Sequence, residues 1–298
     1  MKSLTRRRRG VFVLFTVPAV ALFIWLCLLP FFELFYYSFT NWNGIAPTYK
    51  FVGFTNFTKL LKDPKIWNGL KNNLTFTFVG GIVTYALAFF NSSIICQSNL
   101  KGRKLYQTLL FIPNVMSSVI VSTVWFFIYN PNTGVLNELL AAIGLEAWQQ
   151  LWLNDKKLVV YCLTVVWVWA AQGFYMVLIS SAIEAVPKDY IEAASIDGAN
   201  GWQRFWQITV PLIKETIKTS LVFFFINSFS GVYTYVDVMT KGGPAGASEV
   251  MTTYLYKQAF QQAKYGYGAA ISAFVFVVIM VVCCIMLLLT RTKDSVEY

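Results

Sequence analysis

Polar side chains inside otherwise apolar stretches are the residues of this chain whose types could do chemistry. They are amides, hydroxyls and amphipathic aromatics, namely Asn114, Ser117, Ser118, Trp169, Gln172, Tyr175, Asn227, Ser228, Ser230 and Tyr233. A polar group inside a membrane is costly unless it is paired or faces a wet cavity. The candidates that we select for a substrate pathway are Asn114, Ser117, Trp169, Gln172, Tyr175, Ser228 and Tyr233. Hydrogen bonding between membrane helices is the alternative role of each of them.

Catalytic chemistry has little support in the composition. The chain has no histidine, the commonest general base and nitrogen ligand. Its five cysteines form no C-x-x-C pair, which argues against a zinc or redox site. A G-x-x-x-x-G-K-[ST] loop for nucleotide phosphates is also missing from the sequence. We therefore expect no catalytic residues, no metal and no cofactor, and no ATPase site within this chain.

The elements that must position the polar residues are membrane spans. The sequence is 57% hydrophobic and only 13% charged, about half the charge of ordinary soluble domains. Six stretches of at least 18 residues lack charge, and about 20 apolar residues cross a bilayer as a helix. The predicted spans are about 11–32, 73–95, 107–129, 158–180, 211–233 and 267–290. We expect an all-α polytopic membrane protein, with residues 1–298 forming a single transmembrane domain.

Basic residues predict the orientation of these spans. Six spans place both termini on one side, and the four arginines 6–9 before the first span place that side in the cytoplasm. The segments that are then cytoplasmic, including 101–104 and the C-terminal Arg291 and Lys293, hold 14 of the 24 basic residues. The net charge of +10 therefore reflects orientation in a lipid bilayer, and nucleic acid is not an expected partner.

The segment 184–211 between the fourth and fifth spans is cytoplasmic in this topology and too charged to cross a membrane. Pro187 and Asp189 favour a helix start. Gly198 and Gly201 favour a helix end, and Trp202 resumes an apolar pattern. The segment predicts two short helices around a tight turn, a rigid knob with small residues on one side and aromatics that anchor it. An interfacial linker between two spans is the alternative.

The knob resembles the permease signature of ATP-binding-cassette importers, which reads E-A-A, three residues, Gly, nine residues, Ile, one residue and Leu-Pro. The matching positions are Glu192, Ala193, Ala194, Gly198, Ile208 and Pro211, with Val210 in place of the usual Leu. Other segments are similar to the carbohydrate-uptake group of these permeases. They are 53–57 in the first outer loop, 111–113 in the third span and 240–244 in the last outer loop.

The resemblance implies a multi-pass subunit of a bacterial or archaeal cytoplasmic membrane. It would pair with a second permease in a pseudo-twofold heterodimer, above two ATPase subunits and below an extracytoplasmic solute-binding protein. The knob would be the coupling helix that seats in the ATPase. Its implied ATPase-coupling residues are Glu192, Ala193, Ala194, Asp197, Gly198, Ile208 and Pro211. Transport would proceed by alternating access, driven by ATP hydrolysis in the separate subunits.

The implied cargo is a neutral sugar or oligosaccharide. The same importer type for a glycerol phosphate or another small polar solute is an alternative, but the apolar runs that hold the polar candidates carry no Lys or Arg for an anion. A stand-alone secondary transporter would use intramembrane Asp or Glu for ion coupling, and the six charge-free runs contain none. A membrane enzyme would need a catalytic constellation, which the sequence does not offer.

Overall fold

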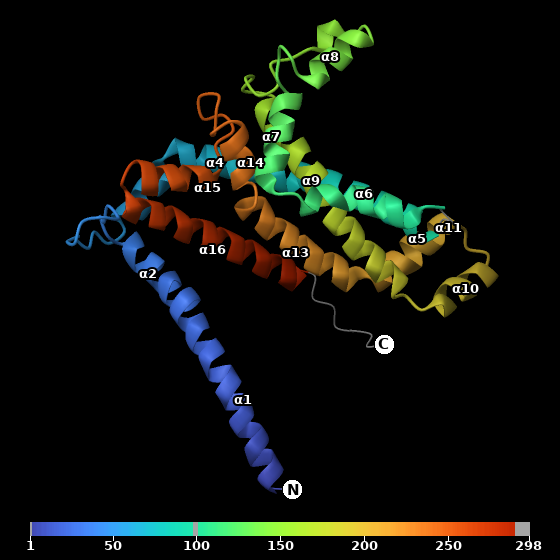
Figure 1. Ribbon diagram of the computed structural model, residues 1–298, viewed down its shortest axis with the longest axis horizontal. Helices are drawn as coiled ribbons and strands as arrows, with labels where there is room; N and C mark the ends of the chain where they lie inside the picture. Colours follow the sequence, from blue (N-terminus) through green and yellow to red (C-terminus); the bar gives the residue numbers. More distant parts are fainter. Residues whose placement is uncertain (1, 98–100, 290–298) are drawn as a thin grey trace. The chain divides into compact units, whose positions relative to one another are not determined.

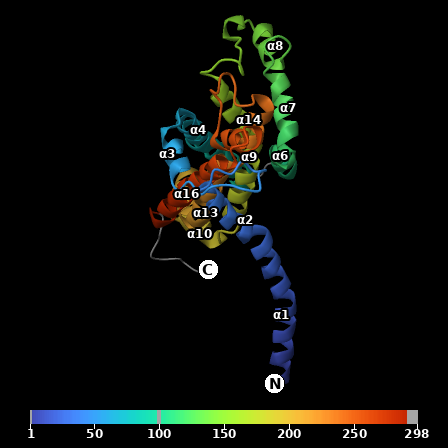
Figure 2. The same cartoon turned by 90° about the vertical axis from the view of Figure 1, so that its left-hand side faces the viewer.

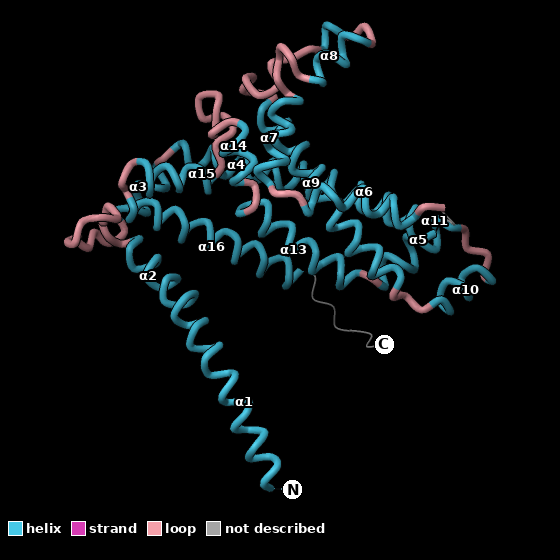
Figure 3. The backbone as a smooth tube through the Cα atoms, in the orientation of Figure 1, coloured by secondary structure: helices cyan, strands magenta, loops and turns pink. Residues whose placement is uncertain are grey.

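The computed structural model describes residues 2–97 and 101–289, and that part of the chain is helical apart from one isolated antiparallel bridge between Thr40 and Phe51 (Figures 1 and 3). The prediction of an all-α protein is confirmed. The predicted end of the last span at residue 290 and the basic Arg291 and Lys293 lie outside the described residues. The single permease domain over 1–298 stays a prediction.

Five helices are long and apolar enough to cross a membrane. They are Val13–Ser38, Pro64–Cys96, Val159–Glu184, Lys214–Met239 and Tyr265–Leu288. A sixth crossing is present if α6 (Arg103–Val115) and α7 (Ser118–Ile128), which are bent by 97° at their junction, form one span. The chain is therefore a polytopic membrane protein.

The bend lies within the segment 107–129, which the sequence pattern presents as one span. Met116 and Ser117 have extended backbone, with ψ angles of 147° and 133°, so the helix stops and restarts there. Pro113 lies one turn before the break and has no backbone N–H for the helical ladder. The amide of Val121 bonds the carbonyl of Ser117 at 3.0 Å and opens the new helix. Apolar composition alone does not reveal such a break.

Contacts divide the chain into two compact units, and the first contains Met1–Asp63 and Leu255–Phe276. Its helices are α1 (Lys2–Phe23), the π-helix η1 (Ile24–Leu28), α2 (Leu29–Ser38), α3 (Thr55–Lys62), the π-helix η5 (Lys257–Gln261) and the first part of α16 (Tyr265–Leu289). Phe276 packs edge-on against Phe31, with ring centroids 5.1 Å apart. The amide of Gly266 bonds the carbonyl of Trp42 at 2.8 Å, where any side chain would overlap the carbonyl of Thr40. The start of α16 is thereby fixed to the loop after α2.

The second unit contains Pro64–Tyr254 and Val277–Tyr298. Its first span is α4 (Pro64–Thr75), the π-helix η2 (Phe76–Gly80) and α5 (Gly81–Gln97), and α6, α7, α8 (Val135–Ala142) and the 3₁₀ turn η3 (Glu146–Trp148) follow. The later elements are α9 (Val159–Glu184), α10 (Lys188–Ile196), α11 (Gly201–Gln203), the π-helix η4 (Arg204–Thr209), α12 (Val210–Leu212), α13 (Lys214–Ser230), α14 (Tyr233–Met239) and α15 (Met251–Tyr256). In both views α7 leads to α8 (Figures 1 and 2). Along the chain α8 precedes α9 and α10 follows it.

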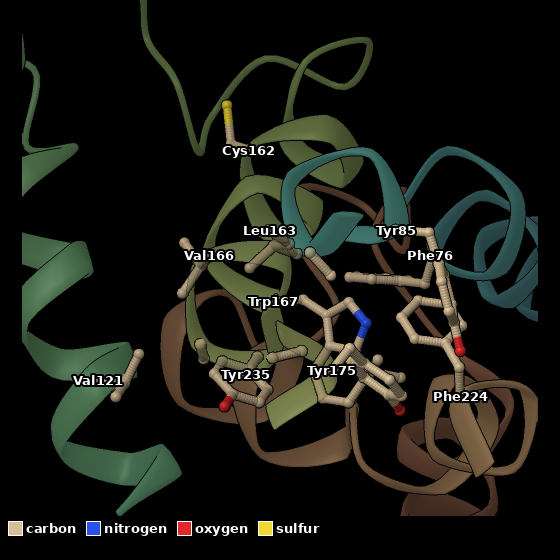
Figure 4. Close-up of a cluster of buried hydrophobic side chains, with 14 of the residues drawn as sticks. Phe76, Tyr85, Val121, Cys162, Leu163, Val166, Trp167, Tyr175, Phe224 and Tyr235 are labelled. Atoms are coloured by element: carbon tan, nitrogen blue, oxygen red, sulfur yellow. The ribbon is translucent and has the colours of Figure 1, made fainter. Parts of the chain in front are cut away.

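Helix α9 is the core of the second unit. It is apolar on every side, and 72% of its most apolar 18-residue window is buried. Trp167 and Tyr175 on this helix pack with Phe224 of α13 in one aromatic cluster (Figure 4). A side chain at Gly173 would overlap the backbone of Leu110, so glycine lets α6 lie directly on α9. This close packing holds α6, which leads into the bend, against α9.

Candidate functional site

The knob between α9 and α13 is a pair of short helices joined by a capped turn. Helix α10 ends at Ile196, and Gly198 follows with φ +81°, a left-handed conformation that favours glycine. The amide of Gly198 bonds the carbonyl of Ser195 at 3.2 Å, and that of Ala199 bonds Ala194 at 2.9 Å. Together these two bonds form a Schellman motif. The turn after α10 is therefore specified by the local sequence.

The second half of the knob starts with a capping box. The side chain of Asn200 accepts from the amide of Gln203, the Gln203 side chain accepts from the amide of Asn200, and both bonds are 2.9 Å long. Gly201 is the first residue of α11 and not a helix terminator. The guanidinium of Arg204 donates to Oγ of Ser195 and ties the two helices together. The predicted two-helix knob is thus present, with Gly201 in a different role.

Much of the proposed coupling surface is open to solvent. Glu192, Ala193, Asp197, Gly198 and Pro211 are exposed, Ile208 is half-buried and Ala194 is buried. Ile196 is 87% exposed beside them, and exposed apolar groups that gather in one place mark interaction surfaces. The arrangement leaves small side chains and two carboxylates, those of Glu192 and Asp197, where a partner could approach the backbone closely.

The aromatics of the knob anchor it only in part. Phe205 is buried at 6% exposure and faces Phe89 of α5, with ring centroids 6.4 Å apart. Trp202 is 73% exposed and Trp206 is 41% exposed. Trp206 also packs on Phe89, with ring centroids 6.1 Å apart. Phe205 and Trp206 therefore hold the knob to α5, and Trp202 remains on the surface.

A cavity of about 290 Å³ lies where α6 and α7 meet at the bend, against α9 and the α13–α14 junction. Its lining residues are Asn114, Ser118, Trp167, Ala170, Ala171, Phe174, Tyr175, Asn227, Gly231 and Tyr235. Two amides, a serine hydroxyl and four aromatic rings thus surround one space. None of these described lining residues is charged.

The cavity gathers only part of the predicted pathway set. Asn114 and Tyr175 line it, together with Ser118 and Asn227, which belong to the wider set of polar residues in the apolar runs but were not selected for the pathway. Ser117, Trp169 and Tyr233 are not among its lining residues. Trp169 instead packs edge-on against Trp125 of α7, with ring centroids 5.7 Å apart.

Two other members of the set make interhelical hydrogen bonds. Gln172 accepts from Asn91 of α5 at 3.2 Å, and Asn91 in turn accepts from the hydroxyl of Tyr106 on α6 at 2.6 Å. The hydroxyl of Ser228 lies 2.6 Å from that of Thr77 in η2. Both side chains are buried, and in this structure they join helices.

Several lining residues escape a search for polar groups. Trp167, Ala170, Ala171 and Phe174 follow the i, i+3, i+4, i+7 spacing and therefore lie on one face of α9. A side chain at Gly231 would come within 3.2 Å of the Trp167 ring, so glycine keeps that wall open. The signal in the sequence is a small-residue pair between two aromatics at helical spacing.

One helix connects the cavity with the knob. Helix α9 carries Trp167 and Phe174 in the cavity wall and ends at Glu184, just before α10. The carboxylate of Glu184 pairs with Arg103 at the start of α6, the helix that leads into the bend. Helices α6 and α9 therefore join the end of the span next to the knob with the wall of the cavity.

Comparison with known proteins identifies the family. Residues 92–294 match the model described as "Binding-protein-dependent transport system inner membrane component". The chain is 34% identical to the probable ABC transporter permease protein YurN of Bacillus subtilis, over 89% of this chain and 90% of that protein. It is 31% identical to the diacetylchitobiose uptake system permease protein NgcF of Streptomyces coelicolor, over 99% and 86% of the two chains.

A solved structure has the same fold. It is a chain of a bacterial alginate ABC transporter in complex with an alginate pentasaccharide-bound periplasmic protein. The TM-score is 0.86 at 25% identity, and the match covers 97% of this chain and 98% of that one. The chain belongs to the binding-protein-dependent inner membrane components: it is a permease of an ATP-binding-cassette importer, multi-pass in the cytoplasmic membrane, whose ATPase lies in separate subunits.

Proposed function

We propose that this permease carries a neutral carbohydrate, a sugar or an oligosaccharide, through the cavity at the α6–α7 bend. The observation that carries the proposal is the lining itself, in which aromatic rings and amides surround a space without a charged group. Pyranose rings present flat apolar faces and many hydroxyl groups. Aromatic rings can cover the faces while Asn114, Ser118 and Asn227 exchange hydrogen bonds with the hydroxyls.

Two relatives support a carbohydrate cargo, and the lining of the cavity argues for a neutral one, since alginate is itself acidic. NgcF is named for diacetylchitobiose uptake, and the solved alginate transporter is bound to a pentasaccharide-loaded protein. A glycerol phosphate would favour cationic side chains in its binding site, since phosphate is usually held by Arg or Lys. The described cavity lining offers none. Among importer cargoes, the neutral carbohydrate therefore fits this cavity better.

The knob is our candidate for contact with the ATPase. We assign Glu192 to a polar contact, Ala193, Ala194 and Gly198 to close seating, and Asp197 to the turn. Ile208 and Pro211 keep their signature positions at the return to the membrane. Support comes from two exposed carboxylates and from the exposed Ala193 and Gly198 on a turn held by a Schellman motif and a capping box. A rigid turn of this kind can act as a lever without bending.

The proposed assembly has a second permease in a pseudo-twofold heterodimer, two ATPase subunits and an extracytoplasmic solute-binding protein. The relative in complex with a periplasmic protein supports the last of these partners. ATP binding and solute delivery would then favour different states of the same pore, which is how alternating access is driven.

The test is solute-stimulated ATP hydrolysis by the reconstituted complex across a panel of ligands presented by the binding protein. We expect a neutral sugar or oligosaccharide to stimulate hydrolysis and to be taken up, while glycerol 3-phosphate does neither. If only glycerol 3-phosphate stimulated hydrolysis and were taken up, the proposal would be wrong and the cargo would be an anionic solute.

A further inference from the structure

A groove between α5 and the second half of the knob has no role in the proposed transport path. Its volume is about 440 Å³. Helix α5 contributes Ala86, Phe89 and Phe90 to its walls, and α11 with η4 contributes Trp202, Phe205 and Trp206. The indoles of Trp202 and Trp206 lie next to each other, with ring centroids 5.4 Å apart. The groove is therefore almost wholly apolar and aromatic.

The groove is continuous with an exposed apolar stripe on a membrane span. Phe78, Ile82, Ala86 and Phe90 follow one another at intervals of four residues, so they lie on one face of the η2–α5 helix. Phe78 is 63% exposed, Ile82 is 72% exposed and Phe90 is 62% exposed. This helix belongs to the candidate span Pro64–Cys96, whose exposed apolar face suits lipid chains. The last two members of the stripe, Ala86 and Phe90, also line the groove, next to Phe89 and Ser93 of the same helix.

The mouth of the groove has the chemistry of a membrane interface. Trp residues concentrate where the hydrocarbon meets the headgroups, and the two indoles lie at the end of the stripe. The guanidinium of Arg204 lies 4.0 Å from the position that a Cβ on Gly201 would take, and Gly201 lines the groove. Lys101 and Lys104 follow α5 in the connection that predicts the cytoplasmic side.

We propose that this groove binds an acyl chain of an anionic phospholipid of the cytoplasmic leaflet, with the lipid phosphate beside Arg204. An apolar slot that continues a lipid-facing stripe suits an acyl chain, and a guanidinium at its mouth suits a phosphate. The occupant would touch Trp202 in the knob, and Arg204 also holds Ser195 across the turn. Any influence of the bound lipid on ATPase coupling depends on the proposed function of the knob. Binding of the lipid to the groove does not depend on it.

The test uses tryptophan fluorescence of the full-length chain in phosphatidylcholine nanodiscs. A small, equal fraction of lipid brominated on its acyl chains is added as either phosphatidylglycerol or phosphatidylcholine. The groove signal is the difference between the wild-type chain and the double variant Trp202→Phe, Trp206→Phe. We expect brominated phosphatidylglycerol to quench this signal at a concentration about fivefold lower than brominated phosphatidylcholine does. One surface Arg strengthens binding to an anionic lipid by about that factor.

Three variants separate a site from general surface attraction. Arg204→Gln should abolish the preference for the anionic lipid, Arg204→Lys should keep it, and Lys214→Gln, an exposed lysine at the start of α13, should leave it unchanged. If the double tryptophan variant does not fold, quenching of the total fluorescence of the wild-type and Arg204→Gln chains still shows whether Arg204 determines the preference for the anionic lipid. Equal quenching by both lipids, or loss of the preference in Lys214→Gln as well, would overturn the site. Loss of quenching when ATPase subunits bind would also overturn the lipid site in the assembled transporter, because a protein would then fill the groove.

Discussion

Gly198 tests the proposed knob with the smallest change. Its φ of +81° costs a non-glycine residue about 1–2 kcal/mol, while no described residue beyond its two chain neighbours lies within 4 Å of an added Cβ. Gly198→Phe should therefore leave the permease folded and inserted, but weaken attachment of the ATPase about tenfold or more by adding volume at the contact. Pull-down of the ATPase and solute-stimulated hydrolysis on matched amounts of inserted protein measure this effect.

The chain supplies a matched control for that strain. Gly144, after α8 on the other side of the predicted topology, has φ +77° and is equally free of neighbours within 4 Å. Gly144→Phe has the same backbone cost but should keep ATPase attachment, and Glu192→Lys should lose it without backbone strain. If Gly198→Phe and Glu192→Lys both retained wild-type attachment and coupling, segment 184–211 would be an interfacial linker.

The amides in the cavity give a second prediction at this scale. Asn114→Ala or Asn227→Ala should remove a hydrogen bond to the solute, worth about 0.5–1.5 kcal/mol. The solute concentration for half-maximal stimulation of hydrolysis should rise about 2- to 13-fold, since each 1.4 kcal/mol is a factor of ten. Asn132→Ala, at an exposed position in the outer segment, is the control. Unchanged solute dependence in both cavity variants would place the solute site in the partner permease.

Gln172 and Ser228 belong to the predicted pathway set but should behave differently. Their side chains join α9 to α5 and α13 to η2 in buried hydrogen bonds. Gln172→Ala should lower thermal stability by about 1–3 kcal/mol, because it leaves the buried Asn91 amide without that acceptor. Thermal unfolding in detergent is followed with and without solute. A structural role of Gln172 lowers the stability of the solute-free chain, whereas a role in solute binding alone leaves unfolding of the solute-free chain unchanged.

At the scale of elements, three asparagines on α4 clamp the outer loop after α14. Asn68 donates to the carbonyl of Gly246 at 2.8 Å, and Asn72 donates to Ala247 and Glu249 at 2.7 Å. Asn73 accepts from the amide of Met251 at 3.0 Å. The loop before α15 is thereby held to the first span of the second unit.

Asn72→Ala should free the outer loop without disturbing the helices. Two loop carbonyls would lose their donor, at a cost of about 1–3 kcal/mol for each unsatisfied group. Hydrogen–deuterium exchange in residues 242–250 should speed up while exchange in α9 stays slow. Asn132→Ala should change neither. Unaltered exchange in the loop of Asn72→Ala would show that other contacts determine its order.

Sequence reasoning found the elements where local chemistry dominates. The charge-free runs predicted apolar spanning helices, and the glycine at position 198 predicted the turn in the knob, because a left-handed residue ends a helix wherever it occurs. The α6–α7 bend was not predicted, since the break at Met116 and Ser117 lies inside a continuous apolar run. Asn114 and Tyr175 were found as polar outliers, whereas Trp167 and Phe174 have the composition of ordinary core residues.

The limits of the pathway prediction have one physical cause. A buried Gln or Ser satisfies its hydrogen bonds equally well with another helix or with a solute, so its type does not reveal which partner it has. Ser228 faces Thr77, a partner 151 residues away in the sequence, and only the packing of the helices reveals that contact. The cavity lining is likewise a property of several helices together.

At the scale of the whole molecule, the chain combines a permease fold with the absence of a nucleotide-binding loop in its sequence. It should therefore neither bind ATP nor move solute alone. Transport should require the second permease, the ATPase pair and the binding protein, because the free energy of ATP hydrolysis comes from the separate ATPase subunits that the knob is proposed to contact.

Uptake of a labelled neutral oligosaccharide into proteoliposomes is the decisive measurement. Vesicles with the complete complex, ATP at the ATPase side and loaded binding protein at the other side should accumulate the sugar. Vesicles with this chain alone, or with the complete complex and no ATP, should not. Accumulation by the chain alone, or driven by an ion gradient without ATP, would contradict the proposed mechanism.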